Sequence, residues 1–138
     1  MEQEITQLLS NRFGIDINEL NVKFVEGKDK AYMCSNELAE LLFRGVQRKG
    51  MIAFKLNTLF GTKPTLDFVL MYGHLATKNY IEFNDDEIKL MYSGKDIIKK
   101  INCDNGLVII KKEEKGIGLV FKKEDVLISL IPKNRFTL

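Results

Sequence analysis

Apolar residues recur at helical spacing at the start of the chain and at strand spacing soon after it. From residue 3 to 13 they lie three and four positions apart, which predicts a helix that ends at Gly14. Apolar and polar residues alternate over 22–25, and a second short run at 31–34 follows a polar turn. This pattern predicts a β-hairpin. The apolar face of the helix contains Ile5, Leu8, Leu9 and Phe13.

The next part of the chain predicts a helix, a strand and a further helix. Ser35 is a favoured N-cap residue, and the apolar residues over 38–46 follow it at helical spacing. The run MIAFKLNTLFG at 51–61 is mostly apolar and predicts a strand that ends in a turn. The dense apolar run at 66–75 suits either a buried helix or a strand. We favour a helix, because proline and threonine directly precede it.

Short strand signals dominate the second half of the chain. The segments 80–83 and 87–92 each predict a strand, with an acidic turn between them. Residues 94–101 then predict a helical turn whose isoleucines face inward, namely Ile97, Ile98 and Ile101. Three further strands are predicted at 107–111, 117–122 and 126–131. So many short strands in succession predict a small barrel or a strongly curled sheet.

The order of these elements predicts an α+β chain of two small domains. A length of 138 residues allows one domain of ordinary size or two small ones. The composition shifts near residues 78–80, where the acidic turn region begins. We therefore predict a small α/β N-terminal domain over 1–78 and a β-rich domain over 79–138.

The total charge is nearly balanced, but its distribution is not. The chain has 21 lysines and arginines against 19 aspartates and glutamates, so the total points to no partner. Residues 82–91 contain four acidic residues and one basic residue, whereas residues 92–138 contain ten basic and six acidic residues. A case for an acidic partner therefore depends on the last third of the chain.

No catalytic, metal or membrane motif is present in the sequence. The two cysteines are too far apart for a metal-ligand pair and too few for a disulfide framework, which favours a reducing compartment. The single histidine, His74, has no nucleophile motif beside it, and no phosphate-binding glycine loop occurs. No apolar stretch is long enough to span a membrane. We expect a soluble cytoplasmic protein that is not an enzyme and needs no metal or cofactor.

Basic residues are the remaining candidates for function. In a helix over 94–101, Lys95 and Lys99 would align on the outer side and could meet successive phosphates. Other lysines and arginines lie in the later strands and in the tail. The same residues could equally form a solvated surface, and charge alone does not decide between these interpretations.

The pattern LMYSGKDIIKKI, then GLVIIKK, then KGIGLVF resembles a PUA domain, an RNA-binding β pseudobarrel with a short helix. The resemblance covers residues 80–131 and rests on Tyr92, Gly94 and the paired isoleucines that follow them. The segments AYMCSNELAELL and LDFVLMYGHLATKNYIEF are similar to the Nip-seven family of large-subunit ribosome-biogenesis factors. That family joins an α/β N-terminal domain to a C-terminal PUA domain.

This resemblance implies a protein that binds single-stranded, U- or AU-rich pre-rRNA and contacts other ribosome-assembly proteins. It implies assistance in rRNA processing without enzyme activity. Two alternatives stay open: a protein-interaction adaptor, and an accessory RNA-binding subunit of an RNA-modifying enzyme. Tyr92 and Phe136 are the candidates for stacking on bases, although Tyr92 suits a core position equally well. The candidate RNA-binding residues are Tyr92, Gly94, Lys95, Lys99, Lys100, Lys122, Lys123, Lys133 and Arg135.

Overall fold

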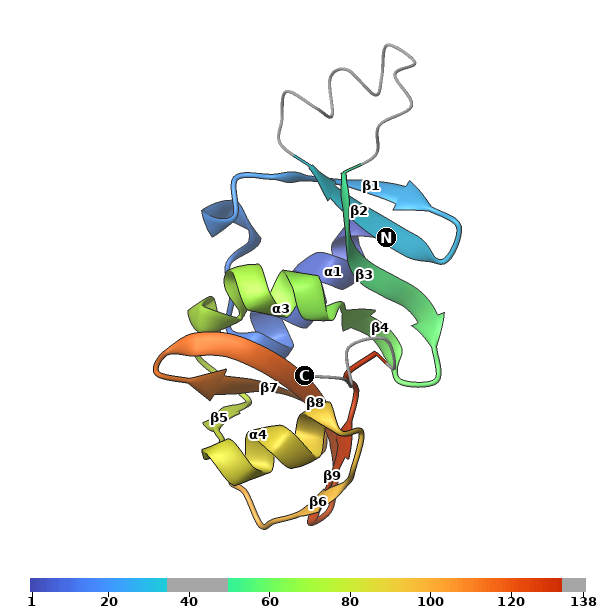
Figure 1. Cartoon of the computed structure of the whole chain (residues 1–138). Helices are drawn as coiled ribbons and strands as arrows, with labels where there is room; N and C mark the ends of the chain where they lie inside the picture. The colour runs from blue at the N-terminus through green and yellow to red at the C-terminus, as the bar shows by residue number, and fades with distance from the viewer. Residues whose placement is uncertain (35–49, 133–138) are drawn as a thin grey trace.

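The computed structural model describes residues 1–34 and 50–132, which form two β-sheets with a helix between them (Figure 1). The chain therefore has the predicted α+β class. The helix predicted after Ser35 and the tail candidates Lys133, Arg135 and Phe136 lie outside the described residues. In the part of the chain that is described, no helix is long and apolar enough to cross a membrane.

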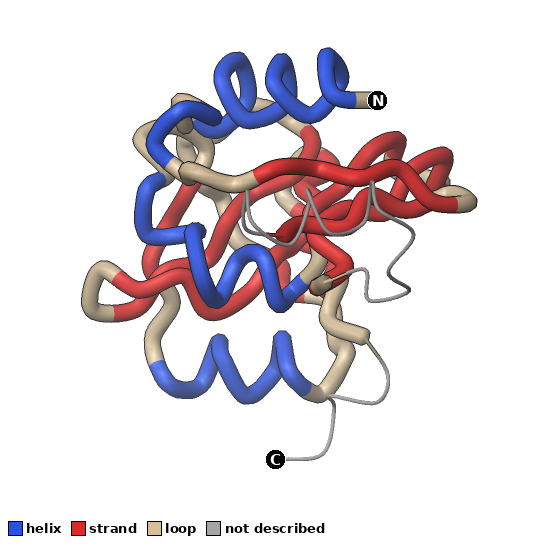
Figure 2. Tube along the Cα trace, turned by 90° about the horizontal axis from the view of Figure 1, so that it is seen from above, coloured by secondary structure: helices blue, strands red, loops and turns tan. Residues whose placement is uncertain are grey.

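The N-terminal segment is helical as predicted. Helix α1, Glu2–Gln7, continues into the π-helical turn η1, Leu8–Arg12, and a short 3-10 helix η2, Ile17–Glu19, follows. The N–H of Gly14 donates to the carbonyl of Ser10 and ends the helical hydrogen bonding. Seen from above, this N-terminal helix crosses one side of the strands (Figure 2).

The first sheet is an antiparallel meander of four strands in the order β1-β2-β3-β4. The predicted hairpin is confirmed as β1, Lys23–Gly27, and β2, Lys30–Cys34. The strand predicted within 51–61 is confirmed as β3, Met51–Thr58, and the turn at its end leads into a strand that was not predicted, β4, Gly61–Pro64. Thr58 pairs with Gly61 across a two-residue turn, so the apolar run folds back on itself.

The ambiguous apolar run after this sheet is a helix, α3, Leu66–Tyr72, followed by the 3-10 turn η3, Gly73–Leu75. The hydroxyl oxygen of Thr65 accepts a hydrogen bond from the backbone N–H of Phe68 at 3.2 Å. This N-cap satisfies one of the free N–H groups of the first turn and fixes where the helix begins.

The second sheet has five strands in the order β5-β7-β8-β9-β6 and curls into half a barrel (Figure 1). Strand β5 runs parallel to β7, and the other neighbours are antiparallel. The two-residue strand β6 pairs with β9 at one edge. The strands are β5, Tyr80–Glu82; β6, Ile97–Ile98; β7, Gly106–Lys112; β8, Lys115–Lys123; and β9, Val126–Ser129.

Two predictions between β5 and β7 are wrong. Residues 87–92 were expected to be a strand but lie in helix α4, Asp85–Tyr92. Asn84 and Glu87 form a capping box, in which each side chain accepts a hydrogen bond from the other's backbone N–H. Three carboxylates in the first turn also suit the positive end of a helix. These local interactions favour a helix over the strand that the alternating apolar residues indicated.

Residues 94–101 were expected to be helical, but they form a turn and the short strand β6. Successive side chains of a strand point to opposite faces. Ile97 is accordingly buried, whereas Ile98 is 83% exposed. Ile98 therefore does not face inward, which corrects the expectation that all three isoleucines do so.

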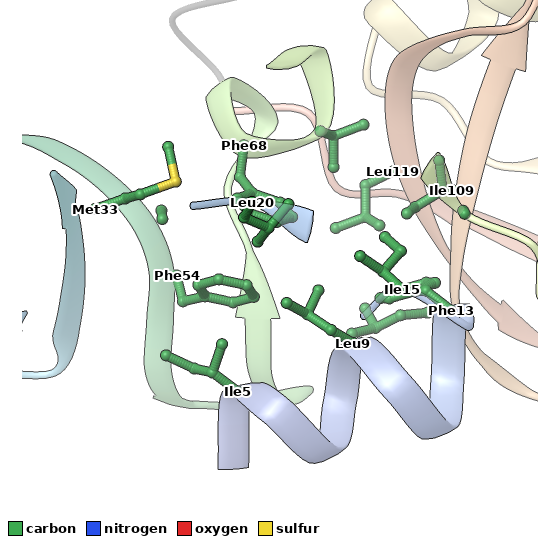
Figure 3. Close-up of a cluster of buried hydrophobic side chains, with 14 of the residues drawn as sticks. Ile5, Leu9, Phe13, Ile15, Leu20, Met33, Phe54, Phe68, Ile109 and Leu119 are labelled. Carbon is green, nitrogen blue, oxygen red and sulfur yellow. The ribbon is translucent and has the colours of Figure 1, made fainter. Parts of the chain in front are cut away.

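The largest core lies between the two sheets and includes residues from both halves of the sequence. Figure 3 shows Leu9 and Phe13 of the N-terminal helix on the side of Ile109 and Leu119 of the second sheet, and Ile5 next to Phe54 of the first sheet. A second core fills the space between α4 and the other face of that sheet; it includes Phe83, Met91, Val108, Ile110, Val120 and Leu127. The second sheet is thus buried on both faces.

The division into domains at residue 78 stays a prediction, and the larger core contains residues from both sides of that position.

Two glycines allow helix α3 to approach strand β8 closely. A Cβ atom on Gly116 would lie 2.3 Å from the carbonyl oxygen of Val69 and 2.8 Å from the Cα of Gly73. A Cβ on Gly73 would lie 3.1 Å from the Cα of Gly116. Backbone meets backbone at this point, so no side chain fits between the helix and the strand.

We expect Gly116→Ala to lower the free energy of unfolding by about 2 to 3 kcal/mol, because α3 must move away from β8 to admit a methyl group. Urea unfolding measures this change. Gly61→Ala is the matched control: its φ is +79° and nothing lies within 4 Å of the added Cβ, so only backbone strain, of about 1 kcal/mol, opposes it. Equal losses in the two variants would contradict the close packing.

Candidate nucleic-acid interface

Tyr92 packs against the second core and is hydrogen-bonded to strand β8. It is the last residue of α4, and its hydroxyl donates a hydrogen bond of 2.6 Å to the carbonyl oxygen of Ile117 in β8. The half-buried ring packs against the second core. Of the two interpretations that the sequence left open, the structure favours a core position for Tyr92.

Gly94 ends helix α4 in a Schellman motif. The N–H of Lys95 donates to the carbonyl of Leu90, and the N–H of Gly94 donates to that of Met91, both at 3.0 Å. The φ of Gly94 is +75°, a conformation that glycine adopts without a steric penalty. The glycine of the PUA-like pattern therefore has a structural role in stopping the helix.

Lys99 forms an ion pair with Glu87 of α4. Its Nζ lies 2.8 Å from Oε2 of Glu87 and 5.8 Å from the centre of the Phe83 ring. Burial raises the pKa of Glu87, but the hydrogen bonds from Lys99 and from the backbone of Asn84, together with the charge of Lys99, place that pKa below its ordinary value. The pair joins α4 to the segment that follows β6.

Lys122 is buried, with 8% of its surface exposed. Its Nζ donates a hydrogen bond of 2.8 Å to Oδ1 of Asn105, and the same oxygen accepts from the backbone N–H of Glu124. These bonds tie the end of β8 to the loop before β7. Lys122 therefore has a partner within the structure.

The remaining described candidates, Lys95, Lys100 and Lys123, are exposed and lie near the β6 edge. Lys123 pairs with Val126, which pairs in turn with Ile98, so these side chains share one face of the sheet. We call the surface around Ile98, with the exposed lysines Lys95, Lys100 and Lys123, the β6 rim. It presents an exposed isoleucine among lysines, a combination that sequence reasoning missed because Ile98 was expected to be buried.

Carboxylates also occur at the β6 rim. Asp96 follows Lys95 directly, and the exposed residues Glu124 and Asp125 form the β8–β9 turn. The rim is therefore close to electrically neutral, and its attraction for a polyanion depends on the positions of individual lysines.

A polar pocket of about 450 Å³ lies at the opposite edge of the sheet, beside β5. It is lined by His74, Tyr80, Glu82, Lys111 and Glu114. The Lys111 ammonium donates to the carbonyls of His74 and Ala76 and lies 3.8 Å from the centre of the Tyr80 ring. Burial lowers the pKa of Lys111, although Glu114 and Glu82 partly oppose this. With two of its three ammonium hydrogens in these bonds, Lys111 fastens the η3 turn to β7.

Within residues 1–34 and 50–132, no group of three or more histidine, cysteine or acidic side chains could hold a metal ion. Comparison of the chain with protein-family models and with curated proteins finds no match.

We expect Glu87→Gln to lower the free energy of unfolding by about 0.5 to 1 kcal/mol at pH 7, because it removes the charge that Lys99 faces but keeps the capping box. The folded pKa of Glu87 is depressed, so this stabilisation is present above the unfolded value, near 4.5, and is lost as the pH falls through the folded pKa. Urea unfolding at pH 7 and at low pH measures both effects.

Asp86→Asn serves as the control, because it removes a negative charge from the same helical turn and Asp86 has no ion pair among the described residues. A loss in Glu87→Gln that matches this control, or one that persists unchanged at low pH, would contradict a stabilising ion pair.

Tyr92→Phe tests the structural role of the tyrosine. Loss of its hydrogen bond leaves the Ile117 carbonyl without that donor and should lower the free energy of unfolding by about 1 kcal/mol. RNA affinity should not change, since the ring stays in the core. Fluorescence anisotropy of a labelled oligouridylate measures the affinity; unchanged stability with weakened binding would place Tyr92 in the interface instead.

Proposed function

We propose that this protein is a non-enzymatic RNA-binding factor that assists pre-rRNA processing and large ribosomal subunit assembly, as the Nip-seven family does. Its residues 79–138 would act as a PUA-like domain, and its RNA would be single-stranded and U- or AU-rich. One observation supports this function most directly. The PUA-like sequence pattern forms a curled five-stranded sheet, and at its edge exposed lysines surround an exposed isoleucine.

The β6 rim offers the contacts that single-stranded RNA requires. Lysine ammonium groups can meet phosphates, and each phosphate contact releases counterions, so that affinity falls as the salt concentration rises. An exposed apolar side chain such as Ile98 can pack against an unstacked base. Lys95, Lys100 and Lys123 are then the main phosphate contacts. Gly94, Tyr92 and Lys122 support the surface from behind, and the tail residues Lys133 and Arg135 stay predicted contacts.

A protein-interaction adaptor is the second candidate, and the exposure of Ile98 favours it. Leu90 of α4 is 40% exposed as well, and large exposed apolar side chains are enriched where proteins bind each other. The interleaved charges of the β6 rim would suit a polar border around such a contact. An accessory subunit of an RNA-modifying enzyme would use the same surface, with catalysis supplied by the partner.

Removing lysine charges from the β6 rim should weaken RNA binding and reduce its dependence on salt concentration. We expect Lys100→Gln/Lys123→Gln to reduce the affinity for a labelled oligouridylate about tenfold at physiological salt. The slope of log K against log salt should fall by about 0.7 for each phosphate contact that is lost. Fluorescence anisotropy between about 50 and 200 mM salt measures both quantities.

The matched control is Lys78→Gln/Lys115→Gln, which removes the same charge from two exposed lysines away from the β6 rim. Lys115 and Lys123 begin and end the nine-residue strand β8, so they lie far apart. Equal losses in both double variants would mean that only the total charge matters. If the native protein binds no RNA but captures a protein partner, and this complex survives nuclease treatment, the adaptor is favoured.

A further inference from the structure

Three lysines form one row across the first sheet. Lys30 of β2 pairs with Lys55 of β3, and Lys55 pairs with Lys63 of β4. Directly paired residues of antiparallel strands project to the same face, and neighbouring strands lie about 4.8 Å apart. We call Lys30, Lys55 and Lys63 the lysine row. It crosses β2, β3 and β4 near the β1–β2 turn (Figure 1).

The lysine row lies on the face of the sheet that is turned away from the core. The next paired row, Ala31 with Phe54 and Pro64, is buried, and Ala31 and Phe54 belong to the larger core. Side chains alternate between faces along a strand, so the lysines next to these residues must point outward. Lys30 and Lys55 are exposed, and Lys63 is half-buried.

This arrangement costs folding free energy, because like charges directly opposite each other in a sheet are destabilising. Burial lowers the pKa of Lys63, and the charge of Lys55 lowers it further. No carboxylate in residues 1–34 and 50–132 forms an ion pair with the row. Asp29, which directly precedes Lys30, accepts a hydrogen bond from Asn57, and Glu4 accepts one from Thr62. Glu26 of β1 pairs with Ala31 and not with a lysine of the row.

An aromatic ring lies beside the lysine row on the same face. Tyr32 is two residues from Lys30, so its side chain projects to the same side of β2. Gly27 of β1 pairs with Lys30, and a Cβ there would lie 2.7 Å from Cε2 of Tyr32. The tyrosine ring therefore packs against the bare backbone of Gly27, at the end of the row, with part of its surface exposed.

We propose that the outer face of the first sheet is a second contact surface for single-stranded RNA, with phosphates along Lys30, Lys55 and Lys63 and a base against Tyr32. This inference rests on the proposed RNA-binding function but places a contact in the other half of the chain. A row of like charges beside an aromatic ring is how proteins bind single strands, because the charges follow the backbone and the ring stacks on bases. The paired positions of the lysine row hold no carboxylate, and the exposed Asp29 beside Lys30 is one negative charge against three lysines, whereas the β6 rim has as many carboxylates as exposed lysines.

The test measures binding of a labelled 30-nucleotide oligouridylate by fluorescence anisotropy at several salt concentrations. Lys55→Gln/Lys63→Gln should weaken binding about tenfold and lower the salt slope by about 1.4, which corresponds to two phosphate contacts. Tyr32→Leu should weaken binding without changing the slope, because stacking involves no counterion release. Lys78→Gln/Lys115→Gln is again the control for charge.

The same variants report on the geometry of the lysine row. Removing two of three opposed charges relieves repulsion, so the urea unfolding midpoint of Lys55→Gln/Lys63→Gln should rise while binding falls. Lys55→Gln alone is the second variant, and it should show both effects to a smaller degree. An affinity loss accompanied by a lower unfolding midpoint would indicate damage to the fold and would overturn the inference.

The outcomes separate this inference from the proposed function. If the β6 rim variant loses affinity and the lysine row variant matches the control, the inference is wrong and the proposed function stands. If only the lysine row variant loses affinity, the inference stands and the RNA contact assigned to the β6 rim is wrong. A native protein that does not bind overturns both. In a last measurement, unlabelled polyglutamate of equal charge competes with the labelled oligouridylate for binding. If it displaces the labelled RNA as well as unlabelled oligouridylate does, the ligand of the lysine row is an acidic polypeptide and not RNA.

Discussion

The backbone contact between Gly73 and Gly116 is the constraint on which the rest of the structure depends. It lets α3 lie directly on β8 while the helix also covers β3, so a single helix serves both sheets. Ile109 and Leu119 can then complete a core begun by α1 and the first sheet. A side chain at either glycine would separate the two layers and open this core, because buried interfaces are close-packed and accommodate an added methyl group poorly.

Several of the candidate RNA-binding residues instead hold the second sheet and α4 together. Gly94 stops α4, Tyr92 bonds to β8, Lys99 neutralises Glu87 and Lys122 is buried against Asn105. A sequence pattern can therefore resemble a binding motif because the fold needs the same residues. The side chains of this region that take no part in these interactions lie at the β6 rim, where a ligand can contact them.

The two candidate surfaces differ in their electrostatics. At the β6 rim, lysines and carboxylates alternate, so binding would depend on local geometry around Ile98. On the outer face of the first sheet, Lys30, Lys55 and Lys63 stand together without an ion-pair partner among the described residues. Such a row reduces the stability of the folded chain. A ligand that neutralises it would recover that free energy, which links binding to stability.

The sequence by itself determined the elements whose signals are local. Helical spacing located α1, a threonine cap and an apolar run located α3, and alternation with polar turns located the hairpin and the strands β7, β8 and β9. Helix α4 was misread because Ile88, Leu90 and Tyr92 alternate like a strand, whereas the capping box at Asn84 and Glu87 decides for a helix. Only the tertiary structure decided which lysines stand free. Strand pairing joins Lys30, Lys55 and Lys63 from distant positions, and no local spacing encodes that register.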